Sequence, residues 1–445
     1  MKTRELTLKI LVAISKGGYS NLLLDRYLKG LKDARDRALI TEMVYGVLRL
    51  KNRLDYIIKD FSRLAINKME PVVIQALRMG VYQLLFLDRV PDRAAVHETV
   101  EAVKAFSNKG AAGFVNAVLR NISRNKEQIS YPDPLKDQKS YLSDYLSHPQ
   151  WLVDYWLKIY GFEKTRDLCE YNNQPVELVI RINSLKVKEE DFLQIYKKAG
   201  FDLRPTWLPQ SYLVLDNRGV ERLPLYKEGA FFVQGLAAAL VGYIMNPLPG
   251  MRILDMAAAP GGKSTHLAEL MGNQGEIIAL DIHEHKLKLI NDNCKRLGVE
   301  IVKTLKCDSR YFKSEEKFDM ILLDAPCSGL GLIKQKPEIR WNKSMADIKK
   351  MTALQLEMLE NALSLLKDGG ILLYSTCTLT REENQNNIAR ILELYPDIIG
   401  IEDIQEDLNR LALKGILEAD DNGLLEIFPP DSQSEGFFIA KLKKF

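Results

Sequence analysis

Five short apolar runs between residues 253 and 377 constrain the fold of this chain more than any other feature. Each run ends in Gly, Pro, Asp or Cys, as in ILDMAAAPGGK, IIALDIHE, LKCDSR, ILLDAPCSG and ILLYSTCT. Short apolar strands of this kind are typical of a parallel sheet that helices cover on both faces. Ligands of such α/β sheets bind at the carboxyl ends of the strands. The residues that follow each run are therefore the candidates for chemistry.

The rest of the chain predicts two further parts ahead of this region. Residues 1–130 show the i, i+3, i+4, i+7 apolar spacing of helices without strand patterns, which predicts an all-α bundle. Residues 131–145 contain two prolines and many polar side chains and predict a linker. Residues 146–240 alternate helix and strand patterns and predict a small α+β subdomain like an RNA-recognition fold. Residues 241–445 would then form a Rossmann-like α/β domain.

Charge is unevenly distributed, although the formal net charge is only +3. Residues 1–150 carry 25 Lys and Arg against 16 Asp and Glu, whereas the remainder carries 37 against 43. A basic amino-terminal third favours an anionic partner such as RNA, with a merely solvated basic face as the alternative. Arg181 and Asn183 fit RNA contacts or solvated side chains equally well, and Arg340 with Trp341 fits an RNA clamp or simple packing.

Cysteine usage and hydropathy limit the class of protein further. The five cysteines contain no C-x-x-C pair, so neither a disulfide framework nor a zinc ribbon fits. Charged residues interrupt any signal-peptide pattern near the amino terminus, and no apolar stretch reaches the roughly 18 residues of a membrane span. We expect a monomeric cytoplasmic protein that uses neither a membrane nor a metal ion.

The first apolar run leads into a glycine turn and then a helix. This turn matches neither G-x-G-x-x-G nor the P-loop, but glycines there let a ligand approach the backbone closely. Asp281 ends the second run, where it can accept both hydroxyls of a ribose, and Asp308 follows the third, where it can accept from an adenine amino group. Each Asp alone could be a cap or turn residue. Together with the turn, they predict a pocket for S-adenosylmethionine.

Two thiols, Cys327 and Cys377, follow the fourth and fifth runs. A buried cysteine is more often inert packing than a nucleophile, but both of these lie beside the predicted pocket. Carbon 5 of a pyrimidine is a weak nucleophile until a thiolate adds to carbon 6. One thiol that attacks and one that assists release would suit such a methyl transfer. A methyltransferase that acts on exocyclic amines would need neither thiol.

The motifs DMAAAPGGKSTHL, DAPCSGLG and YSTCT together resemble those of the RNA cytosine-5 methyltransferases of the NOL1/NOP2/Sun type. In addition, VPDRAAVHETVEAVK and GFVNAVLRNI resemble the NusB-like RNA-binding domain of the family branch that acts on bacterial small-subunit rRNA. The resemblance covers nearly the whole chain. It implies an S-adenosylmethionine-dependent enzyme that methylates carbon 5 of a cytosine in 16S rRNA.

The resemblance also assigns roles by position. It makes Cys377 the nucleophile and Cys327 the thiol that assists product release. The cofactor and the target base would be bound or oriented by Ala257, Ala258, Ala259, Pro260, Gly261, Gly262, Lys263, Asp281 (ribose), Asp308 (adenine) and Asp324. The family often has Cys in place of Ala257 and an acidic residue in place of Gly235. From these departures we expect altered cofactor packing rather than lost activity.

Three alternatives remain open at this point. A tRNA cytosine-5 enzyme would carry the same catalytic motifs, because the bundle favours rRNA by analogy only. A non-catalytic RNA-binding factor would not need three aspartates and both thiols. A DNA cytosine methyltransferase would use the Pro-Cys thiol of Cys327 as nucleophile and would not need Cys377.

Overall fold

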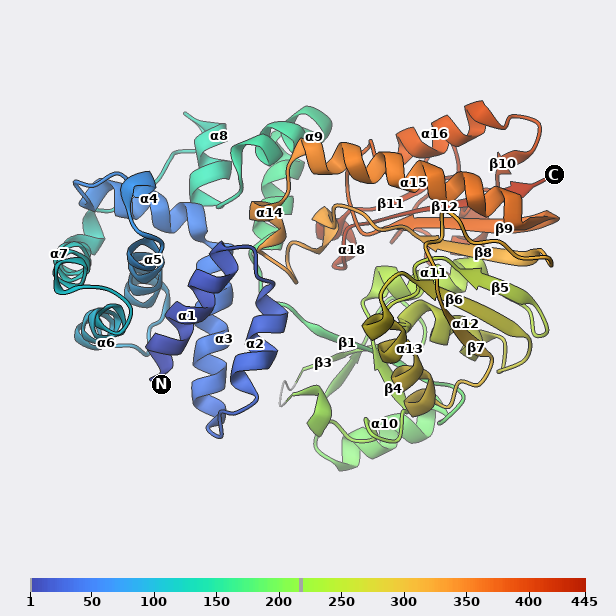
Figure 1. The fold of residues 1–445 in the computed structure, drawn as a ribbon, viewed down its shortest axis with the longest axis horizontal. Coiled ribbons are helices and arrows are strands. Elements are labelled where there is room, and N and C mark those ends of the chain that lie inside the picture. Colours follow the sequence, from blue (N-terminus) through green and yellow to red (C-terminus); the bar gives the residue numbers. More distant parts are fainter. Residues whose placement is uncertain (1, 216–218) are drawn as a thin grey trace. The chain divides into compact units, whose positions relative to one another are not determined.

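A computed structural model of the chain describes residues 2–215 and 219–445, which form two compact units (Figure 1). The first unit comprises residues 1–174 together with 333–342, and the second comprises the remainder. A short segment of the carboxyl-terminal half therefore belongs to the amino-terminal unit. The finer division predicted from the sequence, with boundaries at 130, 145 and 240, stays a proposal.

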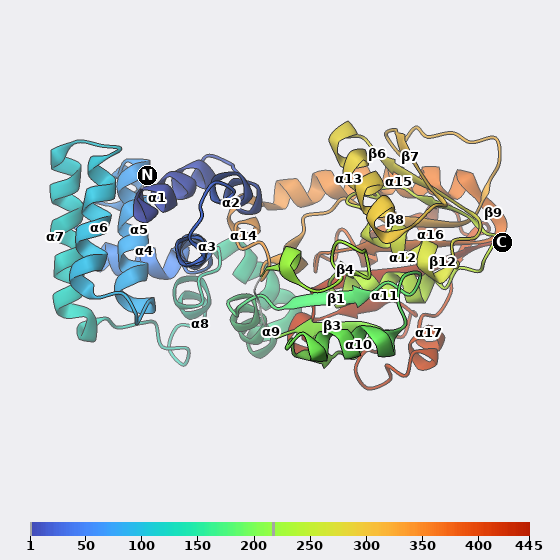
Figure 2. The ribbon, with the colours of Figure 1, turned by 90° about the horizontal axis from the view of Figure 1, so that it is seen from below.

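The first unit contains the helical bundle predicted for residues 1–130, and the first strand of the described chain begins only at Leu178. Twelve consecutive residues of α5, Val73 to Leu84, are buried, so this helix is the core around which α6 and α7 pack (Figure 2). The elements are α1 (Thr3–Ser15), α2 (Ser20–Leu28), α3 (Ala34–Arg49), α4 (Lys51–Phe61), α5 (Pro71–Phe86), α6 (Asp92–Lys104), α7 (Lys109–Asn125), α8 (Gln138–Ser140), the π-helix η3 (Tyr141–Tyr145), α9 (Gln150–Asn172) and α14 (Ile339–Asn342).

Local sequence explains where several of these helices begin and bend. The Asp33 side chain accepts from the Arg35 N–H and caps α3, and Asn108 caps α7 in the same way. Pro71 begins α5, where a missing N–H costs nothing. Gly161 interrupts α9 with a φ of +74°, a conformation that favours glycine.

Arg340 and Trp341 anchor the carboxyl-terminal segment within this bundle. The fully buried Arg340 guanidinium donates to the backbone oxygens of Ser147 at 2.9 Å and Asn172 at 3.2 Å. Trp341 Nε1 donates to the backbone oxygen of Leu48 at 2.7 Å. Of the two interpretations left open by the sequence, packing fits the fully buried Arg340, whereas Trp341 is half-buried and either interpretation remains open for it.

The second unit begins with a four-stranded antiparallel sheet of order β2-β3-β1-β4. The aromatic rings of Phe192, Tyr196 and Phe231 fill its core. This arrangement confirms the predicted small α+β subdomain. Its elements are β1 (Leu178–Ile182), α10 (Glu189–Lys198), β2 (Leu203–Pro205), β3 (Ser211–Val214) and β4 (Phe231–Val233).

Both predictions for Arg181 and Asn183, RNA contact or solvation, are wrong because both side chains are buried. Arg181 forms an ion pair with Glu269, and its Nε donates to Gln234 Oε1 at 2.8 Å. Asn183 Nδ2 donates to two backbone oxygens, one of them that of Leu297 at 2.8 Å. A buried charge needs such partners, and here they come from distant parts of the sequence.

A larger sheet of order β10-β12-β9-β8-β5-β6-β7 forms the body of this unit, with β11 paired to β12. The neighbours in β9-β8-β5-β6-β7 pair in parallel. Strand β12 pairs antiparallel with β9, β10 and β11. The strands are β5 (Arg252–Asp255), β6 (Glu276–Asp281), β7 (Val302–Lys306), β8 (Phe318–Asp324), β9 (Leu366–Thr376), β10 (Ile399–Ile401), β11 (Leu425–Ile427) and β12 (Phe437–Lys444).

Helices cover both faces of the larger sheet, which confirms the predicted Rossmann-like α/β fold. Successive strand residues point to opposite faces, so Ile253 packs with α11, α12 and α13, whereas Leu254 packs with α15 and α16. The helices are α11 (Leu236–Met245), α12 (Gly262–Leu270), α13 (Glu284–Leu297), α15 (Met345–Leu365), α16 (Gln385–Leu394), α17 (Gln405–Arg410) and α18 (Pro429–Ser432). Among the residues described, no helix combines the length and apolarity needed to cross a bilayer.

Candidate active site

The carboxyl ends of the parallel strands carry the predicted site residues. Asp255, Asp281 and Asp324 are the last residues of β5, β6 and β8, and Cys377 directly follows β9. Because β8 lies between β5 and β9, Asp324 occupies the middle of this edge. The topology therefore gathers side chains that are up to 122 residues apart in sequence between Asp255 and Cys377.

The glycine turn between β5 and α12 is tied to the neighbouring strands by its backbone. Met256 N donates to Leu322 O at 3.0 Å, and Ala258 N donates to Leu280 O at 2.9 Å. Gly261 has a φ of +100° just before α12, where a side chain would be strained. The turn is thus held in place with its alanines and glycines at the strand ends.

Asp255 lies beneath this turn and is buried. Ser264 Oγ donates to its Oδ2 at 2.6 Å. Burial raises the pKa of Asp255 to about 6, because the charged form loses water and the Ser264 hydrogen bond only partly compensates.

Lys263 and Asp324 form the polar centre of the site. Lys263 Nζ donates to Asp324 Oδ2 at 2.7 Å, and Ser375 Oγ donates to Asp324 Oδ1 at 2.9 Å. Burial alone would lower the pKa of Lys263, but the Asp324 carboxylate outweighs it and raises that pKa. A donor on each oxygen fixes the orientation of the Asp324 carboxylate.

The two predicted thiols meet beside this pair. The Sγ atoms of Cys327 and Cys377 lie 3.2 Å apart, and both side chains are half-buried. The hydrogen bond with Cys377 and burial raise the pKa of Cys327 well above its usual value. The site therefore favours the protonated form of Cys327.

The two aspartates predicted to bind the nucleoside lie at the ends of β6 and β7. Asp281 Oδ1 accepts from the His283 N–H at 2.8 Å. Arg310 pairs with both oxygens of Asp308, at 2.7 and 3.1 Å, and thereby holds the pKa of Asp308 below its ordinary value. An ionised carboxylate has about four acceptor positions. Asp281 can thus still accept from a ribose hydroxyl. The Asp308 carboxylate already accepts from the Arg310 guanidinium and, at 3.1 Å, from the Arg310 backbone N–H, so an adenine amino group would share these oxygens with Arg310.

Glu383 belongs to this site although the sequence prediction missed it. Its buried carboxylate accepts a hydrogen bond from the backbone N–H of Ser328, the residue after Cys327, at 2.8 Å. The only signal was the T-x-x-E spacing of Thr380 and Glu383, which is also that of a helix capping box and would have predicted a structural role.

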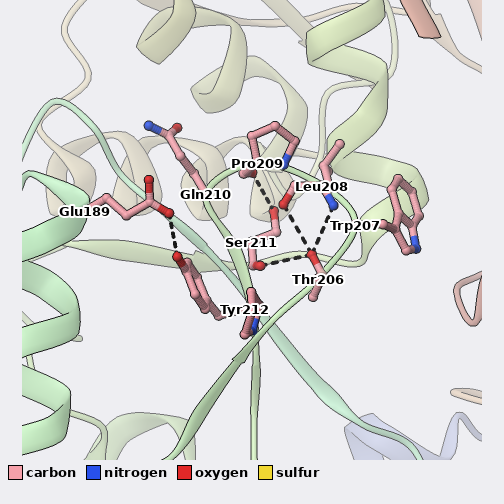
Figure 3. Close-up of a pocket in the computed structure, with 9 residues that line it drawn as sticks. Glu189, Thr206, Trp207, Leu208, Pro209, Gln210, Ser211 and Tyr212 are labelled. Carbon is pink, nitrogen blue, oxygen red and sulfur yellow. Dashed lines mark hydrogen bonds between the residues drawn. The ribbon is translucent and has the colours of Figure 1, made fainter. Parts of the chain in front are cut away.

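A separate pocket lies at the turn between β2 and β3 (Figure 3), and none of the predicted site residues lines it. It is lined by Glu189 and by residues 205–212, with the Glu189 carboxylate accepting from Tyr212 Oη at 2.6 Å. Within the described residues, no group of three His, Cys, Asp or Glu side chains is arranged to hold a metal ion.

Comparisons with known protein families match three parts of the chain. Residues 242–443 match the family described as 16S rRNA methyltransferase RsmB/F, and residues 1–124 match the NusB family. Residues 148–220 match the Methyltr_RsmF/B-like, ferredoxin-like domain.

Similar individual proteins extend over the whole length. The "Probable ribosomal RNA small subunit methyltransferase B" of Bacillus subtilis is 36% identical over 99% of this chain and 98% of that protein. The crystal structure of PH0851 has a TM-score of 0.83 at 28% identity, covering 100% of this chain and 99% of the other. NSun6 from Pyrococcus horikoshii, solved with SFG, has a TM-score of 0.59 at 26% identity, covering 66% of this chain and 98% of the other.

Proposed function

The chain belongs to the RsmB/F family of 16S rRNA methyltransferases, and we propose that it methylates carbon 5 of a cytosine in small-subunit rRNA with S-adenosylmethionine as donor. The observation that carries this proposal is the 3.2 Å separation of the Cys327 and Cys377 sulfurs beside the Lys263–Asp324 pair. A covalent mechanism needs two such groups, one to form a bond to the ring and one to accept a proton.

The cofactor would be held at the strand ends. Asp281 would accept from the ribose hydroxyls, and Asp308 from the adenine amino group. The glycine turn from Ala257 to Lys263 would line the remainder, because its small residues leave the backbone accessible. SFG, an analogue of S-adenosylmethionine, accompanies the similar NSun6 structure and supports this choice. When bound, S-adenosylmethionine supplies an electrophilic methyl group.

Cys377 would begin the reaction as a thiolate. Its electron pair forms a bond to carbon 6 of the cytosine, and the electrons of the C5–C6 double bond make carbon 5 nucleophilic. Asp324, held by Lys263 and Ser375, would contact the polar edge of the pyrimidine and orient the ring. The target base would have to leave its stack to reach these groups.

Cys327 would complete the reaction by releasing the product. After carbon 5 has gained the methyl group, it still carries its original proton. Cys327, having given its own proton to water, takes this proton as a thiolate. The C5–C6 double bond then re-forms, and the bond between carbon 6 and Cys377 breaks, which regenerates the free enzyme. A thiol with a raised pKa suits this role, because its thiolate is the stronger base.

Cysteine variants test the proposal with 16S rRNA from a strain that lacks the enzyme. Cys377→Ala should abolish methyl transfer, whereas Cys327→Ala should leave RNA covalently bound, as a slow band on a denaturing gel. Cys294→Ala, which removes a buried thiol on α13 outside the Cys327–Cys377 pair, is the matched control and should behave as wild type. Bisulfite sequencing locates the methylated base. Normal methylation by Cys377→Ala, or a methyl group on any atom other than carbon 5, would contradict the proposal.

A further inference from the structure

A buried carboxylate behind the two thiols has no part in the mechanism above. Glu383 lies in the turn between β9 and α16 and is fully buried. Its Oε1 accepts from the Ser328 backbone N–H at 2.8 Å and from Gln355 Nε2 at 3.0 Å. Its Oε2 accepts from the hydroxyls of Ser328 at 2.5 Å and Thr380 at 2.6 Å. Four donors around one carboxylate compensate for the water that it loses on burial.

These hydrogen bonds connect the turns that carry the two thiols. Ser328 directly follows Cys327, and Thr378 directly follows Cys377. The Oγ of Ser328 and the Oγ1 of Thr378 lie 2.7 Å apart. Because Ser328 gives its only hydroxyl proton to Glu383, Thr378 must be the donor in this second bond. Glu383 and Thr378, both in the turn after β9, therefore bind the turn after β8 at Ser328.

We propose that Glu383 is a positioning residue for both thiols, an inference that rests on the proposed function. Its carboxylate holds the two turns against each other, so that the Cys327 and Cys377 sulfurs remain within reach of the same pyrimidine ring. Its negative charge also keeps Cys327 protonated until Cys377 has bonded to the base.

The charges around Cys327 support this second effect. The acidic groups that act on Cys327 are Cys377 at the end of β9, Asp324 at the end of β8 and Glu383, whereas the cation Lys263 pairs with Asp324. The hydrogen bond with Cys377 and burial raise the pKa of Cys327 most, and the charges of Glu383 and Asp324 raise it further. Removing only the Glu383 charge should therefore let Cys327 ionise at a lower pH.

Glu383→Gln removes the charge and keeps the shape. Its amide oxygen can replace Oε1 and accept from both N–H donors. Its amide NH₂ can replace Oε2 and donate to the hydroxyls of Ser328 and Thr380, which also act as acceptors. Glu393→Gln is the matched control, because Glu393 lies exposed on α16 and pairs only at the surface with Arg390, at 2.5 Å.

The test measures alkylation of each cysteine by iodoacetamide between pH 6 and pH 10, in the whole chain, with mass spectrometry to separate the sites. In Glu383→Gln the midpoint for Cys327 should fall by about one pH unit. Its alkylation at neutral pH should accordingly be about tenfold faster than in wild type or in Glu393→Gln. An unchanged Cys327 profile in Glu383→Gln would overturn the effect of the charge.

Ser328→Ala tests positioning separately, because it cuts the bridge to Thr378 and leaves the Glu383 charge in place. We expect the Cys327 pH profile to be retained, while cross-linking of Cys327 to Cys377 by the thiol oxidant diamide slows several-fold. Cross-linking at the wild-type rate would overturn the positioning role. Both measurements depend only on thiol chemistry. A failure to methylate RNA would therefore refute the proposed function without deciding this inference.

Discussion

The carboxylate of Glu435 accepts a hydrogen bond from the backbone N–H of Ala237, 198 residues away, at 3.3 Å. Ala237 is the second residue of α11, and the N-cap of that helix is Gly235, which has no side chain to accept. Glu435 therefore caps α11 from the turn before β12. A Cβ built on Gly235 would overlap the Glu435 carboxylate. This carboxylate thus occupies the place where the acidic side chain that we expected at position 235 from the resemblance would begin.

A double substitution tests whether an acidic side chain at position 235 can replace Glu435 as the cap of α11. Glu435→Ala should lower the free energy of unfolding by about 1 kcal/mol, the usual value of an N-cap. Gly235→Asp alone should destabilise the protein by about 1–3 kcal/mol, because its Cβ overlaps Glu435. Combining the two should recover most of the loss, since the new carboxylate at position 235 could then cap the helix itself. Urea unfolding of wild type, the two single variants and the double variant measures the free energies of unfolding. If the losses of the two single variants simply add in the double variant, position 235 cannot replace Glu435 as the cap.

Arg340 should be the most sensitive residue of the first unit. Burial lowers its pKa to about 9, and its main partners include the carbonyl oxygen of Asn172 at the carboxyl end of α9, whose helix dipole favours a cation. Arg340→Ala should cost about 3 kcal/mol, because it leaves buried oxygens without donors. Arg340→Lys should recover little, since an ammonium group cannot reproduce the planar fork of donors.

Intrinsic fluorescence during urea unfolding measures this effect, because three of the four tryptophans, Trp151, Trp156 and Trp341, lie in the first unit. Arg390→Ala, which removes an exposed arginine paired with Glu393, is the control and should change stability by less than about 1 kcal/mol. Equal losses in the two variants would show that Arg340 is not a structural anchor.

The sequence was most informative where local pattern alone determines structure. Asp281 and Asp324 could be placed at strand ends because an apolar run of strand length precedes each of them. The apolar run that begins at Phe437 and Phe438 is also typical of a strand. Its place between β10 and β9 was not recognisable, because its partner β9 ends much earlier in the sequence, at Thr376. Local periodicity carries no information about such antiparallel pairing.

Residues whose role depends on distant partners were harder to predict. Arg181 looked exposed because its strand alternates, and its ion-pair partner Glu269 lies 88 residues away on α12. Glu383 was missed because only the fold brings it next to the turn that carries Cys327. In both cases a buried charge is explained by tertiary contacts that no single segment of sequence contains.

Acidity should affect stability through Asp255. Burial raises its pKa to about 6 in the folded protein, above its ordinary value of 3.8. The folded state therefore binds a proton more tightly than the unfolded chain. The resulting stabilisation is complete below about pH 4 and is lost as the pH rises through 6. Asp255→Asn lacks this titration. As the pH rises from 4 to 7, the melting temperature of wild type should fall relative to that of Asp255→Asn. A constant difference between the two proteins would contradict the raised pKa of Asp255.

Oxidation should inactivate the enzyme reversibly through its two site thiols. The Cys327 and Cys377 sulfurs need to approach by only about 1.2 Å from their 3.2 Å separation to form a disulfide. Diamide accepts the two electrons and two protons that this bond releases. We expect loss of methylation, a peptide linking the two cysteines, and full recovery with dithiothreitol. The buried thiols of Cys169 and Cys294 should remain free. Cys327→Ala, which cannot form the bond, should lose the linked peptide. Inactivation with both site thiols still free would place the sensitive group elsewhere.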